Sequence, residues 1–442
     1  MPMHKPLTAS RSARLSGRLH VPGDKSISHR ALILSALATG RSRIEGLLEA
    51  DDIMATAKVL AALGAEVARS NGAFEVSGQG VGGLRVPGQP LDFGNSGTGS
   101  RLMLGVVAGH DMKAEFTGDE SLRRRPMGRV LAPLTAMGLR VESEKEGETT
   151  LPLTVCGTRD LIPIVYELPV PSAQVKSAIL LAGLHAPGRT SVVEKMATRD
   201  HTELMLAHFG AEVLVEGRDD GTRVVTVCGD AELGKTSLTV PGDPSSAAFA
   251  IAAAAIRPGS DVIIEGVLMN PTRTGFIETL REMGGRIELL DLRGEGGEQV
   301  GDLRIQAAPL KGVRVPPERA PSMIDEYPIL AVVAAFAEGE TRMEGLSELK
   351  VKESDRLRAI AAGLAACGVA ARIEGDDLIV EGRGEVKGGG LVETYMDHRI
   401  AMAFLILGLG ATAPVTVDDT RMIGTSFPGF AELMTKLGAN FS

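Results

Sequence analysis

One short pattern occurs six times in this chain of 442 residues and constrains its fold more than any other feature. In each copy an apolar stretch with helical spacing ends at a glycine, where a left-handed helix cap is favoured, and a strand-like segment follows. The glycines of the six copies are Gly64, Gly138, Gly210, Gly284, Gly368 and Gly438. Because they stand 70 to 84 residues apart, the sequence predicts six repeated α/β units that fill the chain.

Six units of this size are too many for one hydrophobic core, so the sequence predicts two lobes of three units each. The residues VPGD stand at 21–24 and again at 240–243, which marks where the second half begins. We expect residues 21–239 to form the first lobe and residues 240–442 to form most of the second. A ligand site is expected in the cleft between two such lobes.

A second pattern precedes the most apolar helix of each unit, where a polar segment leads directly into the helix. The six segments are PGDKSISHR, GNSGTGSR, PSAQVKS, PGDPSS, PSMIDEY and MDHR. The start of a helix has unpaired N–H groups and a partial positive charge. Several helix starts that face one ligand would therefore attract anions.

Lysine and arginine concentrate in and beside these segments, although the whole chain has a formal net charge of −9. The cations and hydrogen-bonding residues there are Lys25, Ser26, Arg30, Arg125, Ser172, Gln174, Lys352, Arg356 and Arg399. Because salt screens distant charges beyond about 8 Å, this local excess predicts a site for small anions with phosphate or carboxylate groups. Asp325 and Glu353 lie among the cations and are candidates for general acid and base. Each segment alone also fits an ordinary capped helix or a solvated charged face, so the joint occurrence at equivalent points of a repeat carries the prediction.

Composition excludes several classes of function. Cys156, Cys228 and Cys367 are too few and too widely spaced for a disulfide scaffold or a structural zinc site, and they fit a reducing cytoplasm. Aromatic residues make up 3% of an acidic chain without tryptophan, so nucleic acid is not an expected partner. Glycine and proline break the longest apolar stretch, 400–417, which excludes a membrane-spanning helix. We interpret the basic residues 1–18 as a short disordered tail rather than a targeting signal.

The motifs, in their order, resemble the 5-enolpyruvylshikimate-3-phosphate synthase family, and within it the class II branch. The matching segments cover nearly the whole chain and are PGDKSISHRA, LDFGNSGTGSRLMLG, RPMGRVL, SAQVKSAILLAGL, TRDHTE, VPGDPSSAAF, LMNPTRTG, RAPSMIDEYPILAV, KVKESDRL and DHRIAMAF. The resemblance implies a two-lobed α/β enolpyruvyl transferase fold of six βαβαββ units, three per lobe, with the active site in the cleft between the lobes. It also implies that residues 1–20 join residues 240–442 in the second lobe.

The resemblance implies a reaction as well. The family transfers the enolpyruvyl group of phosphoenolpyruvate to the 5-hydroxyl of shikimate 3-phosphate and releases phosphate, in the biosynthesis of aromatic amino acids. No metal or organic cofactor is implied, and neither nucleic acid nor a membrane is an expected partner of this cytoplasmic monomer. Glyphosate is an implied inhibitor that competes for the phosphoenolpyruvate site. The two substrates together carry a charge of about −6, which the six cations would balance.

The resemblance assigns roles to individual residues. Phosphoenolpyruvate would be held by Lys25, Gly97, Arg125, Gln174, Arg356 and Arg399. Shikimate 3-phosphate would be held by Lys25, Ser26, Arg30, Ser172, Ala173, Gln174, Arg199, Asp325 and Lys352. Asp325 would take the hydroxyl proton and Glu353 would handle the methylene proton, with assistance from Lys25.

Two alternatives remain open at this point. UDP-N-acetylglucosamine enolpyruvyl transferases share the fold and the donor, but they usually carry a catalytic cysteine before an Arg-Pro, and GDESLRRRPMG has none. The other is a non-catalytic repeat protein that binds acidic ligands.

The chain also departs from the class I pattern, because segment 424–428 lacks a lysine and Ala173 replaces a serine. Gly97 leaves space that an alanine would fill, so we expect glyphosate to inhibit.

Overall fold

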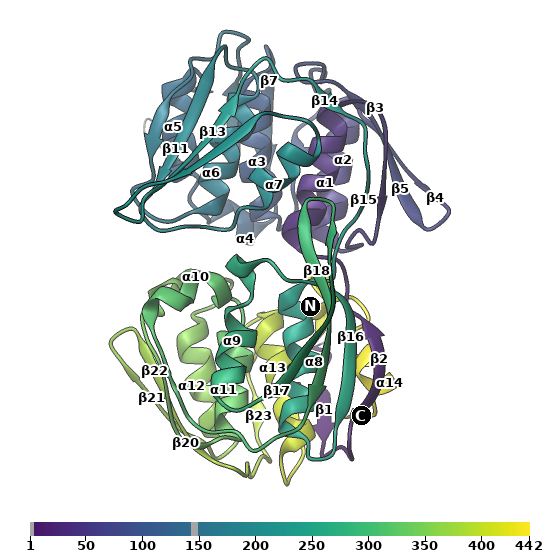
Figure 1. The fold of residues 1–442 in the computed structure, drawn as a ribbon, viewed down its shortest axis with the longest axis vertical. Helices are drawn as coiled ribbons and strands as arrows, with labels where there is room; N and C mark the ends of the chain where they lie inside the picture. The colour runs from purple at the N-terminus through teal and green to yellow at the C-terminus, as the bar shows by residue number, and fades with distance from the viewer. Residues whose placement is uncertain (1–3, 143–148) are drawn as a thin grey trace. The chain divides into compact units, whose positions relative to one another are not determined.

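A computed structural model describes residues 4–142 and 149–442 of the chain (Figure 1). The chain divides into two compact units. Unit 1 comprises residues 1–22, 241–293 and 299–442, and unit 2 comprises residues 23–240 and 294–298. Each unit thus draws on segments that lie far apart in the sequence.

Unit 2 alternates helices and strands from its first residues onward. Its helices are α1 (Lys25–Leu37), α2 (Asp51–Ala62), α3 (Gly97–Ala108), α4 (Glu120–Arg123), α5 (Gly128–Met137), α6 (Ala173–Gly183) and α7 (His201–His208). Its strands are β3 (Ala38–Glu45), β4 (Glu66–Ser70), β5 (Ala73–Gln79), β6 (Leu91–Asp92), β7 (Lys113–Thr117), β8 (Arg140–Glu142), β9 (Leu153–Cys156), β10 (Val165–Glu167), β11 (Arg189–Glu194), β12 (Val213–Gly217), β13 (Arg223–Cys228), β14 (Leu233–Gly234) and β15 (Ser237–Thr239).

Unit 1 begins with two strands from the N-terminus and continues after residue 240. Because Leu7–Ser10 and Ser16–His20 form these strands and Ala9 and Leu15 are buried, the expectation of a disordered tail over residues 1–18 is wrong for its described part. Its helices are α8 (Pro244–Ile256), α9 (Gly275–Glu282), α10 (Ala320–Met323), α11 (Tyr327–Ala335), α12 (Arg356–Ala366), α13 (His398–Gly410) and α14 (Phe430–Lys436), with short 3₁₀ turns η1 (Pro271–Arg273), η2 (Pro317–Arg319), η3 (Ser347–Val351) and η4 (Arg421–Thr425). Its strands are β1 (Leu7–Ser10), β2 (Ser16–His20), β16 (Asp261–Leu268), β17 (Arg286–Glu295), β18 (Glu298–Gln306), β19 (Arg314–Val315), β20 (Glu338–Met343), β21 (Ala370–Glu374), β22 (Asp377–Arg383), β23 (Leu391–Val392), β24 (Val415–Val417) and β25 (Asn440–Phe441). Residues 294–298, where β17 ends and β18 begins, group with unit 2.

Within the described residues, each unit contains three small sheets with the same pairing pattern. The strand orders are β14-β3-β5-β4, with β15 also on β3, then β6-β7-β9-β8 and β10-β11-β13-β12 in unit 2, and β17-β18-β16-β2, β19-β20-β22-β21 and β23-β24-β1-β25 in unit 1. In every sheet one strand pairs in parallel on one side and antiparallel on the other, as β3 does with β14 and β5. The repetition confirms the predicted fold of six repeated units, three in each half.

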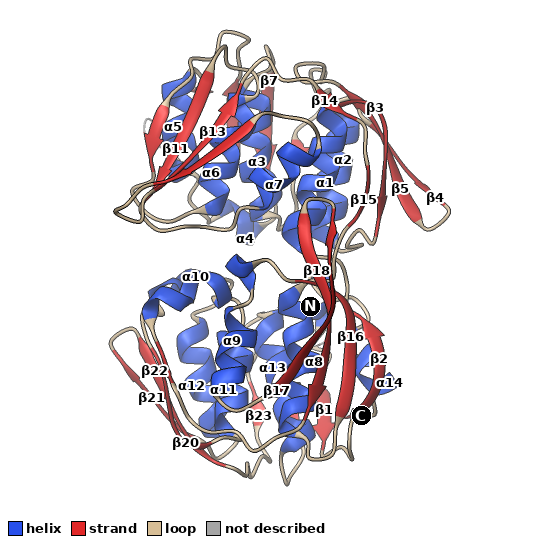
Figure 2. Cartoon of the chain, in the orientation of Figure 1, coloured by secondary structure: helices blue, strands red, loops and turns tan. Residues whose placement is uncertain are grey.

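The core of each unit is built from its most apolar helices. In unit 2, α1, α3 and α6 lie side by side, and in unit 1, α8, α11 and α13 do so (Figure 1). Every residue of α8 and of α11 is buried. The strands lie outside these helices (Figure 2), because a sheet with one apolar face buries it against a helix layer.

The six glycines of the repeat have the backbone geometry that the sequence predicts. Their φ angles lie between +77° and +121°, in the region that only glycine adopts without strain. Each ends a helix and turns the chain toward the next strand. The apolar stretch near residue 400 forms α13, which is 13 residues long. No helix in the described ranges is long and apolar enough to cross a membrane.

Candidate active site

Three of the polar segments start the central helices of unit 2, as predicted. Their N-cap side chains are Asp24, Ser96 and Ser172, and each accepts a hydrogen bond from a backbone N–H of the first helical turn. Lys25 and Gly97 are the first residues of α1 and α3, and Ala173 is the first residue of α6. The positive ends of three helix dipoles thus coincide with the residues expected to bind anions.

Lys25 has a partner that the sequence did not indicate. Its ammonium group forms an ion pair with the carboxylate of Asp52, in the first turn of α2. The Asp52 side chain is 8% exposed, whereas that of Lys25 is 32% exposed. The buried carboxylate therefore holds Lys25 in place, while part of the lysine side chain stays exposed to solvent.

Gly97, Arg125 and Gln174 gather around one further arginine. Arg101 donates through Nη1 to the carbonyl of Gly97 at 3.1 Å and to Oε1 of Gln174 at 3.2 Å, and Nη2 donates to the carbonyl of Pro126. Burial lowers the pKa of Arg101 to about 10, and the charge of Arg125 acts in the same direction. Two cations that repel each other in a poorly solvated place are stabilised when an anion binds between or beside them.

Arg125 is oriented by the loop before α3. Its Nη2 donates to the side-chain oxygen of Asn95 at 2.8 Å and to the hydroxyl of Ser121 at 3.2 Å. The amide of Asn95 is fixed in turn by the carboxylate of Asp119 at 2.7 Å. The second amide in this group, that of Gln174, donates to the hydroxyl of Thr98 on α3 at 2.9 Å.

Arg30 lies deeper than the sequence suggested. Only 4% of this residue is exposed, and its three nitrogens donate to Thr202 Oγ1 at 2.7 Å, Ser177 Oγ at 2.7 Å and the carbonyl of Ser26 at 2.9 Å. Burial lowers its pKa to about 10, so it remains charged at neutral pH. The nearby charge of Arg199 lowers it too, which places the two arginines in one electrostatic group.

In unit 1 the predicted residues gather around Arg356, the first residue of α12. Its guanidinium donates to three carboxylates: Nε to Asp397 at 2.8 Å, Nη2 to Glu353 at 2.5 Å and Nη1 to Asp325 at 3.3 Å. The side chain is 1% exposed. Burial opposes its charge, but the three carboxylates outweigh burial and raise the pKa of Arg356 above its usual value.

The two candidate acid–base residues thus share one cation. Partial burial favours the neutral form of Glu353, but the charge of Arg356 outweighs it, so the pKa of Glu353 lies well below its usual value. Arg399, the second residue of α13, donates to the backbone carbonyl of Asp325 at 3.2 Å. Lys352 lies directly before Glu353 and is half-buried.

Comparison with known proteins decides the family. The sequence model of the protein family EPSP synthase (3-phosphoshikimate 1-carboxyvinyltransferase) matches residues 9–434 of this chain. This chain belongs to the EPSP synthase family. A 3-phosphoshikimate 1-carboxyvinyltransferase of Methylorubrum extorquens is 61% identical over 98% of this chain and 97% of its own length, and one of Parvibaculum lavamentivorans is 59% identical over 98% and 96%. The solved EPSP synthase of Acinetobacter baumannii is 41% identical, with a TM-score of 0.90 over 99% of each chain.

The family, fold and reaction predicted from the sequence are confirmed. The chain is a transferase of the shikimate pathway with 3-phosphoshikimate 1-carboxyvinyltransferase activity. The chain is therefore neither a UDP-N-acetylglucosamine enolpyruvyl transferase nor a non-catalytic repeat protein.

Sequence reasoning missed several residues of the site in this EPSP synthase. Arg101 carried a usable signal, because it stands four residues after Gly97 and so shares its helix face. Asp52 carried none, since it lies on another helix and looks like an ordinary acidic first turn. Asp397 was visible as an N-cap, and it caps α13 while it also binds Arg356.

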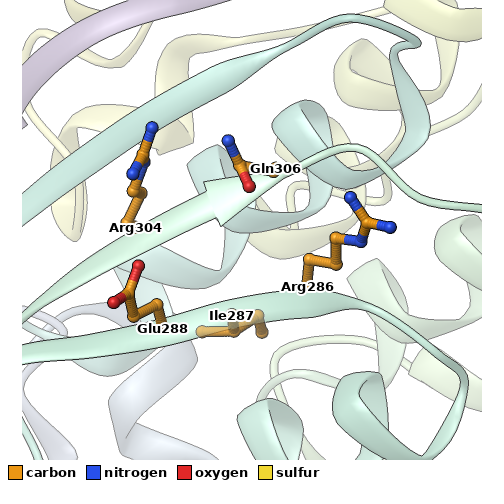
Figure 3. A pocket seen from close by; sticks show the side chains of 5 residues that line it. All are labelled: Arg286, Ile287, Glu288, Arg304 and Gln306. Carbon is orange, nitrogen blue, oxygen red and sulfur yellow. The ribbon is translucent and has the colours of Figure 1, made fainter.

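Two cavities are lined by none of the candidate site residues named above. One of about 180 Å³ in unit 1 is lined by Arg286, Ile287, Glu288, Arg304 and Gln306 (Figure 3). Arg304 and Gln306 both donate to the carboxylate of Asp261 there, so Arg304 is already paired with an acidic group of the protein. The other, of about 280 Å³ in unit 2, has an apolar wall around Tyr166 and Val170. Within the described ranges, no cluster of three or more His, Cys, Asp or Glu residues is suited to a metal ion.

Proposed function

We propose that the residue groups of the two units act together on one molecule each of phosphoenolpyruvate and shikimate 3-phosphate. The observation that carries this proposal is the pairing of Asp325 and Glu353 on the buried guanidinium of Arg356. The reaction must take a proton from a hydroxyl and add one to a carbon, and two carboxyl groups in one place supply both functions.

Phosphoenolpyruvate is assigned to the more cationic part of the site. The residues that bind it are Lys25, Gly97, Arg125, Gln174, Arg356 and Arg399. The repulsion between Arg101 and Arg125 supports this assignment, because a phosphate or carboxylate group would relieve it. Arg101 joins the set as the residue that holds Gly97 and Gln174 in place.

Shikimate 3-phosphate is assigned to the starts of α1 and α6 and to the acid of unit 1. The residues that bind it are Lys25, Ser26, Arg30, Ser172, Ala173, Gln174, Arg199, Asp325 and Lys352. Ser172 and Ala173 offer a hydroxyl and backbone N–H groups at a helix start, which suits the phosphate. Arg30 contributes to binding through its positive charge, because its nitrogens already donate to protein oxygens.

The chemistry then proceeds in two steps. The 5-hydroxyl oxygen attacks the phosphate-bearing carbon of phosphoenolpyruvate, Asp325 takes the hydroxyl proton, and Glu353 gives a proton to the methylene carbon. This forms a tetrahedral intermediate with a methyl group. In the second step the bond between that carbon and the phosphate oxygen breaks, Asp325 gives its proton to the leaving phosphate, the methyl group returns a proton to Glu353, and the enolpyruvyl ether and phosphate result. Lys25 and the arginines stabilise the phosphate as it leaves.

Glu353 starts from its ionised form, so substrate binding must change its proton affinity. Arg356 holds the pKa of Glu353 low, although it also pairs with Asp325 and Asp397. When the anionic groups of the substrates arrive, they offset the charge of Arg356 and raise the pKa of Glu353. Proton uptake on formation of the ternary complex follows from this account.

Asp325→Asn tests the assignment of the base. The variant keeps a side chain of the same shape, so shikimate 3-phosphate should bind with an affinity within about threefold of the parent, whereas turnover should fall by at least about 10²-fold. Calorimetry measures the first quantity and phosphate release measures the second. Near-parent turnover in the variant would overturn the role of Asp325.

The acceptor is tested with the parent enzyme. Phosphate release from phosphoenolpyruvate should depend on shikimate 3-phosphate and should not occur with a UDP-sugar. Release with the UDP-sugar alone would overturn the substrate assignment.

We further propose that the protein acts as a cytoplasmic monomer and that glyphosate inhibits it. The three free cysteines support a reducing compartment. Glyphosate carries a phosphonate and a carboxylate, the same pair of anionic groups as phosphoenolpyruvate, and so fits the same cations. Sedimentation of the purified enzyme and inhibition kinetics against phosphoenolpyruvate test these two points.

A further inference from the structure

Lys176 is a lysine without solvent access, on the second turn of α6. Its side chain is 0% exposed, and its ammonium group lies 3.0 Å from Oε2 of Glu194 and 2.7 Å from Oε1 of Glu203. Both glutamates are buried as well. Ionisable groups are rarely buried at this depth unless they are paired, because the removal of each from water is costly.

Glu194 connects this lysine to the loop that carries Arg199. One carboxylate oxygen of Glu194, at the end of β11, accepts from both the backbone N–H and the hydroxyl of Thr198. The Lys176 ammonium also donates to the carbonyl of Thr198 at 3.5 Å. Three hydrogen bonds therefore hold Thr198 in place, and Arg199 is the next residue of the chain.

Glu203 connects the same lysine to α7. Lys176 and Ser177 are neighbours on α6, and Thr202 and Glu203 are neighbours on α7. The two pairs join the helices twice, by the ion pair of Lys176 with Glu203 and by the hydroxyl contact of Ser177 with Thr202 at 2.6 Å. The same two hydroxyl groups accept from Arg30.

The backbone at the start of α6 belongs to the same network. Ser177 donates to the carbonyl of Ala173 at 2.7 Å, and Ser172 caps the helix one residue before it. Arg30, the Ser172–Ala173 helix start and Arg199 are thus held by contacts that converge on two adjacent residues of α6.

We propose that Lys176 is a positioning residue for the shikimate 3-phosphate site, acting through Glu194 and Thr198 on Arg199 and through Glu203 on the start of α7. The inference rests on the proposed assignment of Ser172, Ala173 and Arg199 to that substrate. Lys176 itself has no access to the substrate, so it sets where these groups lie and takes no part in the chemistry.

The charge of Lys176 is needed because it lies between two buried carboxylates. Burial raises the pKa of Glu203, and the charge of Lys176 acts against that rise. Without the ammonium group the two carboxylates would repel each other, and one would take up a proton or draw in water. Either change releases the 195–200 loop from the start of α6.

Lys176→Met tests the proposal, with Lys113→Met as its matched control. Lys113 makes the same chemical pair with Glu142, but their side chains are 63% and 50% exposed, and neither lies in the 195–200 loop. In Lys176→Met the dissociation constant and KM for shikimate 3-phosphate should rise about 10- to 100-fold, as expected for a displacement of the order of 1 Å. The KM for phosphoenolpyruvate and kcat should change by less than about threefold. Lys113→Met should match the parent in all four quantities.

A purely structural role would give a different result. It would lower the unfolding temperature and the active fraction but leave the affinity of the folded molecules for shikimate 3-phosphate unchanged, which would overturn the proposal. If Lys176→Met does not fold, Thr198→Val decides, because it removes one hydroxyl and keeps the ion pairs. Its affinity for shikimate 3-phosphate should fall about tenfold, and an unchanged affinity would overturn the proposal.

Arg199→Ala separates this inference from the assignment of the site. If Arg199→Ala loses affinity for shikimate 3-phosphate while Lys176→Met and Thr198→Val keep it, the positioning role is wrong and the site stands. If Arg199→Ala binds shikimate 3-phosphate like the parent, the proposed site assignment itself is wrong.

Discussion

Replacement of Gly97 by alanine would test the geometry of the proposed phosphoenolpyruvate site most directly. A Cβ atom at this position would lie 2.8 Å from Nη1 of Arg101 and 3.2 Å from Nη1 of Arg125. Ordinary contacts of this kind begin near 3.4 Å, so the Arg101 guanidinium must move by about 0.6 Å. The φ angle of Gly97 is not in the left-handed region, so the backbone accepts alanine without strain.

The expected magnitude follows from this crowding. Excess volume in a packed place costs about 1–3 kcal/mol, which corresponds to about 5- to 150-fold in a binding constant. Glyphosate has three atoms between phosphorus and the carboxyl carbon, whereas phosphoenolpyruvate has two. Because the longer molecule needs the space beside Gly97, the inhibition constant of glyphosate should rise by about 5- to 150-fold. The KM for phosphoenolpyruvate should rise less than about fivefold.

Inhibition kinetics with phosphoenolpyruvate as the varied substrate measure both quantities. Gly217→Ala is a matched control, because a Cβ there meets no atom within 4 Å. The thermal stability of Gly97→Ala should stay close to that of the parent, since alanine favours the helix and offsets part of the contact. An unchanged inhibition constant, or equal rises for inhibitor and substrate, would refute the steric reasoning.

Three further outcomes follow from the structure. Arg101→Lys should raise the KM for phosphoenolpyruvate about tenfold in steady-state kinetics, because a lysine cannot hold Gly97 and Gln174 together; an unchanged KM would show that Arg101 does not organise the site. Arg356→Met should lower the free energy of unfolding by about 3–5 kcal/mol in urea titrations, since it removes the buried guanidinium that three carboxylates share, and a loss below about 1 kcal/mol would contradict the ion-pair account. Burial, with the charge of Arg399, lowers the pKa of His398 from 6.5 to about 3, so the unfolded chain binds one more proton than the native state between these values and stability falls as pH falls through that window. His398→Gln should reduce the slope of unfolding free energy against pH between 6 and 4 by about 1.4 kcal/mol per pH unit, and an identical slope would mean that His398 is already charged in the native state.

Local patterns of the sequence were enough to predict the repeated unit and the places of the candidate site residues on its helices. The glycine caps needed only the helical spacing before them and the φ freedom of glycine. The polar segments were recognisable as helix starts because N-cap residues and apolar runs are adjacent in the chain. Local sequence was thus sufficient to place Lys25, Gly97, Ser172 and Arg356 at or beside helix starts.

The partners of these residues were decided by tertiary structure alone. Arg30 donates to Ser177 and Thr202, which lie 147 and 172 residues away in the sequence. The periodicity of a segment reports which face of an element is buried, but it does not report which distant element covers that face.

The same reason explains why three carboxylates meet at Arg356 and why a buried lysine supports the Arg199 loop. Such contacts depend on how helices from different repeats pack against each other. The sequence by itself determined which groups the protein has and on which elements they lie, and only the packing of those elements decided which charges neutralise one another.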